Sequence, residues 1–476
     1  MAKDMGAVAP TDEERLVDDL VARARAAQAA FERGADQARY DNAAAAVAWA
    51  LMEPARNREL AEMAVRMTGL GNVEDKVLKN HRKTLGLLRD LKGARTQGVV
   101  EEDPDRGLTV IARPIGVVAA IVPSTNPVAT PANNAINALK CGNAIILAPS
   151  PKGVGVCERL VGHIHAELDR LGLSRDLVQM LPAPASKAKT QRLMETTDLL
   201  VVTGSQDNVR RAYSSGTPAV GVGAGNVSVI IDETADLDAA AARIAASKTF
   251  DNATSCSSEN ALVIVDAVHD DAIAALTAAG GRMLGDADAR RLKTALFGPD
   301  GLNRAMIARD IGQVIAEAGL TVPDPDTARF LMIPGEGIGP DHPESGEKLS
   351  LVATVYRARD YDDAADIAAR LLRHQGAGHS VGIHTARDDR AVALGMDLPT
   401  CRVIVNQPHC FATGGSFENG LPFSLSMGCG SWGGNSIDEN LNYTHFLNRT
   451  RIVRPIPARE PSVEEMLGDY WKVAGK

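Results

Sequence analysis

Apolar residues recur at helical spacing through residues 11–95 of the chain. In "DEERLVDDLVARARAAQAAFE" (12–32) they fall three and four positions apart, and the acidic residues at the start suit the positive end of a helix dipole. The pattern changes at 98–116, "GVVEEDPDRGLTVIARPIG", where two short strand-like runs flank the turn signal Asp-Pro-Asp. We therefore predict helices over 11–95, followed by a hairpin over 98–116.

Short, fully apolar runs alternate with helix-like segments from residue 115 to residue 231. These runs are "IGVVAAIV" (115–122), "NAIILAP" (143–149), "DLVQML" (176–181), "TDLLVVTGS" (197–205) and "NVSVIID" (226–232). Strands that are apolar throughout are typical of a parallel sheet with helices on both faces. Such sheets bind ligands at the carboxyl ends of their strands, where "PSTNP" (123–127), "APSPKG" (148–153) and "TGS" (203–205) follow. The pattern predicts an α/β fold with a ligand site along that edge.

A second alternation of helices and strands begins near 237–250 and continues to about residue 435. Its turn-rich stretch "GPDHPESGEKLS" (339–350) is predicted to be a loop. Close to the end of the chain, "TRIV" (450–453) reads as a short strand. We expect this strand to pair with the hairpin at 98–116.

Composition narrows the classes of function. The chain has 476 residues, of which 45% are hydrophobic and 23% charged, so a globular protein with two or more lobes is expected. The net charge of −9 argues against a nucleic acid or an anionic membrane as the main partner. The first residues lack the apolar segment of a signal peptide, and no apolar run is long enough to cross a bilayer. The six cysteines contain no CxxC pair, which indicates neither a zinc site nor a disulfide framework and favours a reducing cytoplasm.

One cysteine stands apart from the apolar runs. Cys256 lies in "FDNATSCSSEN" (250–260), among small and polar residues at the junction of a helical stretch and an apolar strand. Thiols become reactive in polar, partly accessible surroundings, so Cys256 is a candidate nucleophile. An inert cysteine that only packs is the alternative that this context leaves open.

Several motifs together resemble the aldehyde dehydrogenase superfamily, in particular its coenzyme A-acylating branch. They are "VPSTNPVATPANNAINALKCGNAIILAPSP" (122–151), "VVTGS" (201–205), "GVGAGN" (221–226), "FDNATSCSSE" (250–259), "EKLS" (347–350), "GAGHS" (376–380) and "MGCGSWGGNS" (427–436). The resemblance covers roughly residues 10–455 and rests on the order and spacing of the motifs together. It implies a Rossmann-like cofactor domain, an α/β catalytic domain and an oligomerisation hairpin that pairs with a neighbouring subunit.

The resemblance assigns the chain to three parts. They are a cofactor-binding domain (1–231, interrupted by the hairpin 98–116), a catalytic domain (232–440) and a C-terminal segment that pairs with the hairpin (441–476). A hairpin with exposed edges invites pairing with a second chain, so a homodimer or homotetramer is expected.

By the same resemblance, Cys256 is the nucleophile that adds to an aldehyde carbon, which leads to a thioester on the enzyme. Asn126 in "PSTNP" matches the residue whose side-chain amide stabilises the oxyanion, together with the backbone N–H of Cys256. A purely local role for Asn126 remains open, because Asn-Pro commonly starts a turn.

The chain departs from hydrolytic members at "GVGAGN". Those members carry a glutamate that activates water on the thioester, and Val222 stands at that position here. Without this base the thioester is expected to persist until the thiol of coenzyme A attacks it. "GVGAGN" also serves as a Gly-rich approach to the strand "VSVII", and the two readings are compatible.

For the cofactor, the resemblance implies NADP or NAD. The residues expected to contact it are Ser124, Thr125, Pro149, Lys152, Thr203, Gly204, Ser205, Gly223 and Glu347. At "ILAPSPKG", Ala148 and Pro151 stand where many hydrolytic members have the lysine and glutamate that bind the adenosine ribose. Without that glutamate a 2′-phosphate is not repelled, and Lys152 is close enough in sequence to pair with it. NAD is not excluded.

His379 in "GAGHS" matches a histidine typical of acylating members, and an active-site role and a structural role stand as equal alternatives. No metal-ligand spacing is present. The segment "TGGSFENGLPFSLSMGCGSWGGNS" resembles acylating enzymes that act on sulfoacetaldehyde more than those that act on acetaldehyde. Five polar residues in it are candidate donors to a sulfonate, namely Thr413, Ser416, Asn419, Ser424 and Ser426.

The predicted function is therefore reversible oxidation of a small aldehyde with coenzyme A and NAD(P)+. The competing substrates are acetaldehyde, propionaldehyde and succinate semialdehyde. The competing functions are a hydrolytic aldehyde dehydrogenase, an acyl-phosphate reductase of the same fold, and a scaffold that kept the fold without the chemistry.

Overall fold

The computed structural model describes residues 10–298 and 301–475. Residues 1–9 and 476, which the predicted domain limits included, lie outside the described residues. Four helices open the chain: α1 (Asp12–Glu32), α2 (Gln37–Met52), α3 (Pro54–Thr68) and α4 (Val73–Leu91). Side chains at their starts accept backbone N–H groups, as Thr11 does for α1 and Asn72 for α4, so the helical segment that the sequence predicted has well-formed N-termini.

The first sheet has five parallel strands in the order β5-β4-β3-β6-β7. The strands are β3 (Val117–Val122), β4 (Ala144–Pro149), β5 (Val178–Met180), β6 (Leu199–Val202) and β7 (Ala219–Gly221). The connecting helices are α5 (Ala129–Lys140), α6 (Val154–Arg170), α7 (Lys187–Thr196) and α8 (Gln206–Tyr213). Every residue of β3 and β4 is buried, which explains their unbroken apolar sequence. The strand order reverses between β3 and β6, and this switch point is where such sheets bind ligands.

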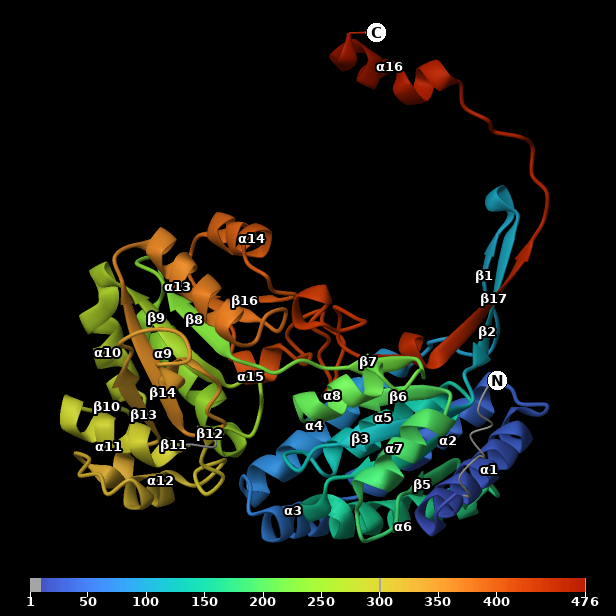
Figure 1. The fold of residues 1–476 in the computed structure, drawn as a ribbon, viewed down its shortest axis with the longest axis horizontal. Helices are drawn as coiled ribbons and strands as arrows, with labels where there is room; N and C mark the ends of the chain where they lie inside the picture. Colours follow the sequence, from blue (N-terminus) through green and yellow to red (C-terminus); the bar gives the residue numbers. More distant parts are fainter. Residues whose placement is uncertain (1–9, 299–300, 476) are drawn as a thin grey trace, which may run out of the picture.

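The second sheet has seven parallel strands in the order β10-β13-β14-β9-β8-β15-β16. The strands are β8 (Val227–Ile231), β9 (Glu259–Val265), β10 (Gly281–Met283), β13 (Phe330–Pro334), β14 (Val352–Ala358), β15 (Val381–His384) and β16 (Val403–Val405). The helices of this part are α9 (Leu237–Thr249), α10 (His269–Ala278), α11 (Asp286–Leu296), α12 (Ile311–Glu317), α13 (Tyr361–His374), α14 (Asp388–Asp397) and α15 (His409–Ala412). A two-stranded ribbon, β11 (Phe297–Gly298) with β12 (Gly301–Leu302), lies beside them. Figure 1 shows the two sheets in separate lobes.

The strand β8 corrects one sequence expectation. The sequence placed 226–232 at the end of the first alternation and set the boundary at residue 231, but β8 pairs with β9 and β15 in the second sheet. The chain therefore passes from one sheet to the other before β8, in the loop that contains "GVGAGN". A buried strand reads as apolar in either sheet, and only long-range pairing decides which one it joins.

The third sheet is antiparallel and joins β1 (Gly98–Asp103), β2 (Leu108–Pro114) and β17 (Leu447–Val453). The pairing of the C-terminal strand with the hairpin, which the sequence predicted, is confirmed. Figure 1 shows this sheet projecting from the lobe of the first sheet, with the last helix, α16 (Val463–Ala474), lying away from both lobes. Both outer strands have an edge that no strand in the described residues covers.

Candidate active site

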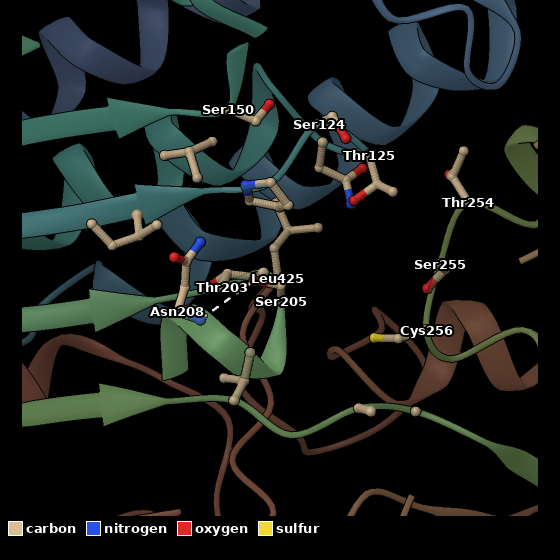
Figure 2. Close-up of a pocket in the computed structure, with 18 of the residues that line it drawn as sticks. Ser124, Thr125, Ser150, Thr203, Ser205, Asn208, Thr254, Ser255, Cys256 and Leu425 are labelled. Atoms are coloured by element: carbon tan, nitrogen blue, oxygen red, sulfur yellow. Dashed lines mark hydrogen bonds between the residues drawn. The ribbon is translucent and has the colours of Figure 1, made fainter. Parts of the chain in front are cut away.

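A pocket of about 1000 Å³ lies at the carboxyl ends of the first sheet and reaches the segment that contains Cys256. Its walls come from the residues after β3, β4 and β6, from the loop before β8, and from the segment Thr254–Ser257. In Figure 2 the sulfur of Cys256 points into the space beside the strand ends that carry Ser124 and Thr203. The pocket is therefore shared by the two lobes.

Most of the residues that the sequence singled out line this pocket. They are Ser124, Thr125, Asn126, Pro149, Thr203, Gly204, Ser205, Gly223, Cys256 and Glu347. Lys152 does not line it, because the short turn after β4 directs Pro151 to the pocket and leaves Lys152 exposed. The lysine and arginine that line the wall formed by α7 and α8 are Lys187 and Arg211.

Strained backbone precedes Cys256. Asp251, Asn252 and Ala253 have φ values of 49°, 53° and 58°, in a left-handed region that costs non-glycine residues about 1–3 kcal/mol each. Contacts from the first lobe hold this segment: Lys76 and Lys79 lie 3.0 and 2.5 Å from Asp251 Oδ2. Burial opposes the charge of Asp251, yet the two ammonium groups hold the pKa of its carboxyl below its usual value. This ion-pair cluster fixes the turn that presents Cys256.

Lys79 also fixes the amide of Asn126. The Lys79 ammonium donates to Asn126 Oδ1 at 3.0 Å and to Thr254 Oγ1 at 3.0 Å. An ammonium group can only donate, so the amide oxygen must face Lys79 and the amide NH₂ must face away from it. The NH₂ of Asn126 and the backbone N–H of Cys256 donate to no protein acceptor within residues 10–298 and 301–475. Both donors are thus free to bind an oxygen in the pocket.

The thiol of Cys256 is protonated at neutral pH. Burial, and secondarily the neighbouring Glu347, raises its pKa to about 12. His379 does not line the pocket, but its Nε2 lies 3.4 Å from Cys256 Sγ. Burial, with Arg402 nearby, lowers the pKa of His379 to about 3, so the imidazole is neutral. A neutral imidazole beside a protonated thiol can accept the thiol proton as the sulfur attacks.

A buried hydrogen-bond chain orients this imidazole. His379 Nδ1 lies 2.8 Å from Ser380 Oγ, which lies 2.9 Å from His409 Nε2. When Nδ1–H donates to Ser380 and the Ser380 hydroxyl donates to His409, His379 Nε2 is a bare acceptor facing Cys256. Donation in this direction holds His379 in the tautomer that a base requires.

The loop before β8 lies against Cys256. A Cβ atom at Gly225 would lie 2.1 Å from the Cys256 carbonyl oxygen, so only glycine fits there. Val222 lines the pocket, and its side chain has no group that accepts a proton. Glu347 lines the pocket too, and burial raises the pKa of its carboxyl to about 8.

The pocket fits a nicotinamide dinucleotide. Ser150 Oγ and Glu347 Oε1 are buried in its lining without a hydrogen-bond partner among the described residues, and a ribose offers hydroxyl groups to such atoms. Ser205 begins α8 as its N-cap at the carboxyl end of β6, a place where backbone N–H groups can face a phosphate. Ser150, Thr203, Ser205 and Glu347 are the residues that would hold the dinucleotide.

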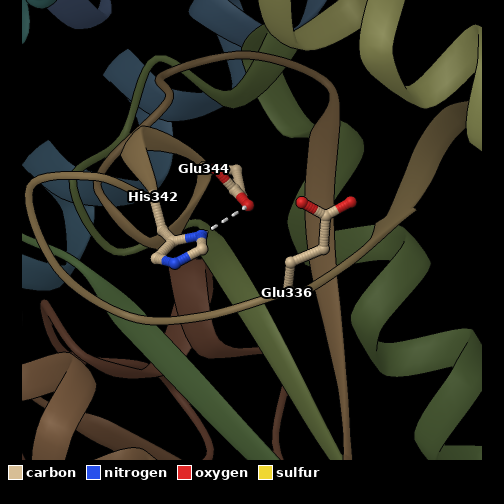
Figure 3. Close-up of side chains that lie close together, drawn as sticks. All are labelled: Glu336, His342 and Glu344. Atoms are coloured by element: carbon tan, nitrogen blue, oxygen red, sulfur yellow. Dashed lines mark ion pairs between the residues drawn. The ribbon is translucent and has the colours of Figure 1, made fainter.

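Within residues 10–298 and 301–475, one cluster of metal-ligand type lies outside the pocket. Ligand atoms of Glu336, His342 and Glu344 lie within 4.8 Å of one another (Figure 3). Lys293 already pairs with both carboxylates, since its ammonium lies 3.3 Å from Glu336 and 2.9 Å from Glu344. The cluster is accounted for as a lysine–carboxylate network.

Sequence reasoning missed the cations of the pocket wall, three of which come from α4. Lys79, Arg82 and Lys83 on α4 all line the pocket, although Cys256 lies far along the chain. Their spacing in "KNHRK" places them on one helix face, which is the signal that the sequence offers. Because α4 lies far from Cys256 in the sequence, the pattern alone does not show that these side chains reach the site.

Two parallel sheets share a pocket lined by a thiol and free amide donors, with an imidazole behind the thiol, and together they define an α/β enzyme with a cysteine at its centre. The model of the aldehyde dehydrogenase family matches residues 2–299. The chain belongs to this family, and the fold and family that the sequence predicted are confirmed.

Individual proteins similar to this chain are also aldehyde dehydrogenases. An acylating sulfoacetaldehyde dehydrogenase from Cupriavidus necator is 58% identical over 96% of this chain and 92% of its own length. An acylating sulfoacetaldehyde dehydrogenase from Bilophila wadsworthia is 39% identical over 97% of this chain and 100% of its own length. An acetylating aldehyde dehydrogenase from Geobacillus thermoglucosidasius has a solved structure with a TM-score of 0.90 and 32% identity, covering 94% of this chain and 98% of its own. Among the described residues, no helix is long and apolar enough to span a membrane.

Proposed function

We propose that this protein is a coenzyme A-acylating aldehyde dehydrogenase that converts a small aldehyde, coenzyme A and NAD(P)+ to an acyl-CoA, NAD(P)H and a proton. Cys256 is the proposed nucleophile, and Asn126 is the proposed oxyanion donor. The observation that carries the proposal is the combination of a pocket-facing Cys256 thiol with Val222 at the position of the hydrolytic base. The 58% identity to a relative named as acylating supports it.

The residues act in a defined order. His379 Nε2 accepts the thiol proton while Cys256 Sγ adds to the aldehyde carbon, so the thiol, whose pKa is raised to about 12, does not have to ionise beforehand, and His379 later releases this proton to solvent. The aldehyde oxygen gains negative charge and accepts from the NH₂ of Asn126 and the N–H of Cys256. When bound, the dinucleotide supplies a hydride acceptor for the carbon attached to Cys256. Cys256 then carries a thioester.

The second half of the reaction distinguishes this enzyme from hydrolytic relatives. Water is a weak nucleophile that needs a base, and Val222 cannot take a proton from it. A thiol ionises more readily and is intrinsically nucleophilic, so coenzyme A attacks the Cys256 thioester and displaces the Cys256 sulfur. One thioester replaces another, which makes the reaction reversible.

Omission of coenzyme A tests the proposal. We expect at most one NAD(P)H per active site in coenzyme A-free buffer and continuous turnover once coenzyme A is added, measured by absorbance at stopped-flow and steady-state times. Acyl-CoA plus NAD(P)H should give the aldehyde in the reverse assay. Sustained oxidation to the free acid without coenzyme A would contradict the acylating assignment and favour a hydrolytic enzyme.

The proposed substrate is sulfoacetaldehyde, supported by the names of the Cupriavidus and Bilophila relatives. A panel of sulfoacetaldehyde, acetaldehyde, propionaldehyde and succinate semialdehyde, each assayed with both nicotinamides, tests this choice. The same panel decides between NADP and NAD. Of the cations near the dinucleotide part, Lys187 and Arg211 replace Lys152 as the candidates for a 2′-phosphate, because they line the pocket.

The two sheets divide the work of the enzyme. We assign dinucleotide binding to the first sheet with the N-terminal helices, and the nucleophile to the second sheet. The uncovered edges of the sheet β1-β2-β17 support a homodimer or homotetramer. The six free cysteines of the chain support a reducing cytoplasm, and its net charge of −9 supports the absence of a nucleic-acid or membrane partner.

A further inference from the structure

We propose that Arg82 and Lys83, on one face of α4, form an anion subsite that binds the negatively charged group of the aldehyde. The inference rests on the proposed function, since it names what recognises the substrate at the same site. It makes the enzyme selective for short aldehydes that carry a sulfonate or a similar anion.

The three cations that α4 contributes to the pocket differ in how they are paired. The three N–H groups of the Lys79 ammonium all donate hydrogen bonds, to Asp251, Asn126 and Thr254. Arg82 has no hydrogen bond or ion pair within the described residues, and its guanidinium lies 4.6 Å from the centre of the Phe411 ring. Its N–H donors are therefore available to a ligand in the pocket.

Lys83 is also without a carboxylate partner. Its ammonium donates to the Gly414 carbonyl oxygen at 2.5 Å and lies 5.6 Å from the centre of the Phe423 ring. Two of its three N–H donors have no acceptor in the described residues. A Cβ atom at Gly414 would lie 2.6 Å from this ammonium, so the glycine makes room for it.

The uncompensated charge is costly unless a ligand uses it. Burial lowers the pKa of Lys83 to about 7 and lowers the pKa of Arg82 from its ordinary value. Two cations on one pocket wall without a counter-ion are unusual in a chain whose net charge is −9. A bound anion removes this cost and stabilises the charged form of Lys83.

The side chains of the lining suit a sulfonate on a short aldehyde. The planar fork of a guanidinium donates to two oxygens of an oxyanion at once, while an ammonium takes a third as a point charge. Phe250 and Phe411 line the same pocket, with ring centres 4.5 Å apart, and offer an apolar surface to the methylene group. Cys256 lies in the lining of the same pocket.

The polar residues that the sequence offered as sulfonate donors are used elsewhere. Of Thr413, Ser416, Asn419, Ser424 and Ser426, only Ser424 lines the pocket. The Ser424 hydroxyl donates to the Ser426 carbonyl oxygen, and the Thr413 hydroxyl donates to the His409 carbonyl oxygen. These hydroxyls hold the loop together, which leaves recognition to α4.

The test compares two aldehydes on matched variants. Sulfoacetaldehyde and 3,3-dimethylbutanal have similar shapes, but a neutral tert-butyl group replaces the sulfonate in the second. Arg82→Met and Lys83→Met are compared with Arg89→Met, a control on the same helix whose guanidinium also lies over phenyl rings but outside the pocket. Each is assayed at saturating coenzyme A, and its Tm is recorded.

We expect Arg82→Met to lower kcat/KM for sulfoacetaldehyde about 10- to 100-fold, mainly through KM, as loss of a charge-assisted hydrogen bond does. Activity on 3,3-dimethylbutanal should change less than about 3-fold, Arg89→Met should resemble the wild type, and Arg82→Lys should recover part of the loss. Equal losses on both aldehydes, or a rise confined to the KM of coenzyme A, would overturn the subsite.

Calorimetric binding of isethionate, 2-hydroxyethanesulfonate, separates this inference from the proposed function. Binding by the wild type that is lost in Arg82→Met and retained in Arg89→Met supports the subsite, even if sulfoacetaldehyde is not turned over. Equal binding by all three proteins would overturn it. Failure of the wild type to oxidise sulfoacetaldehyde would instead refute the proposed substrate.

Discussion

Lys79→Met should separate the positioning of Asn126 from the stability of the fold. Lys79 donates to Asn126 Oδ1, to Asp251 and to Thr254, so its removal frees the amide and leaves a buried carboxylate close by. The amide can then turn its NH₂ toward Asp251 and present its oxygen to the pocket. An oxygen at that position repels the oxyanion that Cys256 creates.

The size of the effect follows from the bonds exchanged. The hydrogen bond from the Lys79 ammonium to Asn126 is worth about 1.5–3 kcal/mol. It therefore favours the productive amide orientation over the flipped one by about 10- to 100-fold. Complete loss of one oxyanion donor costs about 100- to 1000-fold in kcat, which sets the upper limit. We therefore expect kcat for Lys79→Met to fall about 10- to 100-fold, with a smaller change in KM, in a steady-state assay of NAD(P)H formation.

Lys76→Met is the matched control. Lys76 is a second buried lysine of α4 that pairs with the same Asp251 oxygen, at 3.0 Å, and donates to the Thr125 carbonyl oxygen at 3.4 Å, but makes no hydrogen bond to the Asn126 side chain. Each variant leaves Asp251 with one ammonium partner, so similar decreases in Tm are expected for both. If Lys76→Met loses as much kcat as Lys79→Met, or if Lys79→Met changes only Tm, the positioning argument is refuted.

Further variants test the other parts of the site and the assembly. Cys256→Ser should abolish NAD(P)H formation with an unchanged circular dichroism spectrum; turnover near the wild-type rate would remove the thiol from the mechanism. Asn126→Ala should lower kcat roughly 100-fold, and a change confined to KM would point to binding instead. In His379→Ala the thiol, with its pKa raised to about 12, must ionise unaided, so the rate should rise about tenfold per pH unit between about pH 7 and 9; a pH profile like that of the wild type would exclude His379 as the base. Light scattering should show an oligomer that charged substitutions on β17 dissociate, and a fully active wild-type monomer at micromolar concentration would assign the hairpin another purpose.

Local patterns sufficed for most of the fold. Continuous apolar runs predicted β3 and β4 because both are buried throughout, and the turn signal predicted the hairpin of β1 and β2. The same patterns misplaced β8, since its sequence meets the demands of either sheet and its partners come from distant segments. Which strands neighbour each other is a property of the whole chain.

The sequence also predicted some features of the candidate site and not others. Motif resemblance pointed to Cys256 and Asn126, and the structure brings both to one pocket. Lys152 was expected near the dinucleotide because it is close to the motif in sequence, but a short turn after β4 directs its side chain to solvent. Conversely, nothing in the sequence between Lys79 and Asp251 shows that a buried ion pair joins them.

Helix α4 ties specificity and catalysis to one rigid element. Its N-terminal half carries Lys79, which orients the amide that faces the oxyanion, and one turn further it carries Arg82 and Lys83, which face the pocket without a counter-ion. A substrate anion bound at Arg82 and the Asn126 amide that Lys79 orients are therefore both held by side chains of α4, which limits the change in distance between the two subsites. An aldehyde with an anion one carbon further away would have to displace its carbonyl from the donors. Selectivity for chain length should therefore be expressed in kcat as well as in KM, because a misplaced carbonyl loses stabilisation of the oxyanion and not only ground-state binding.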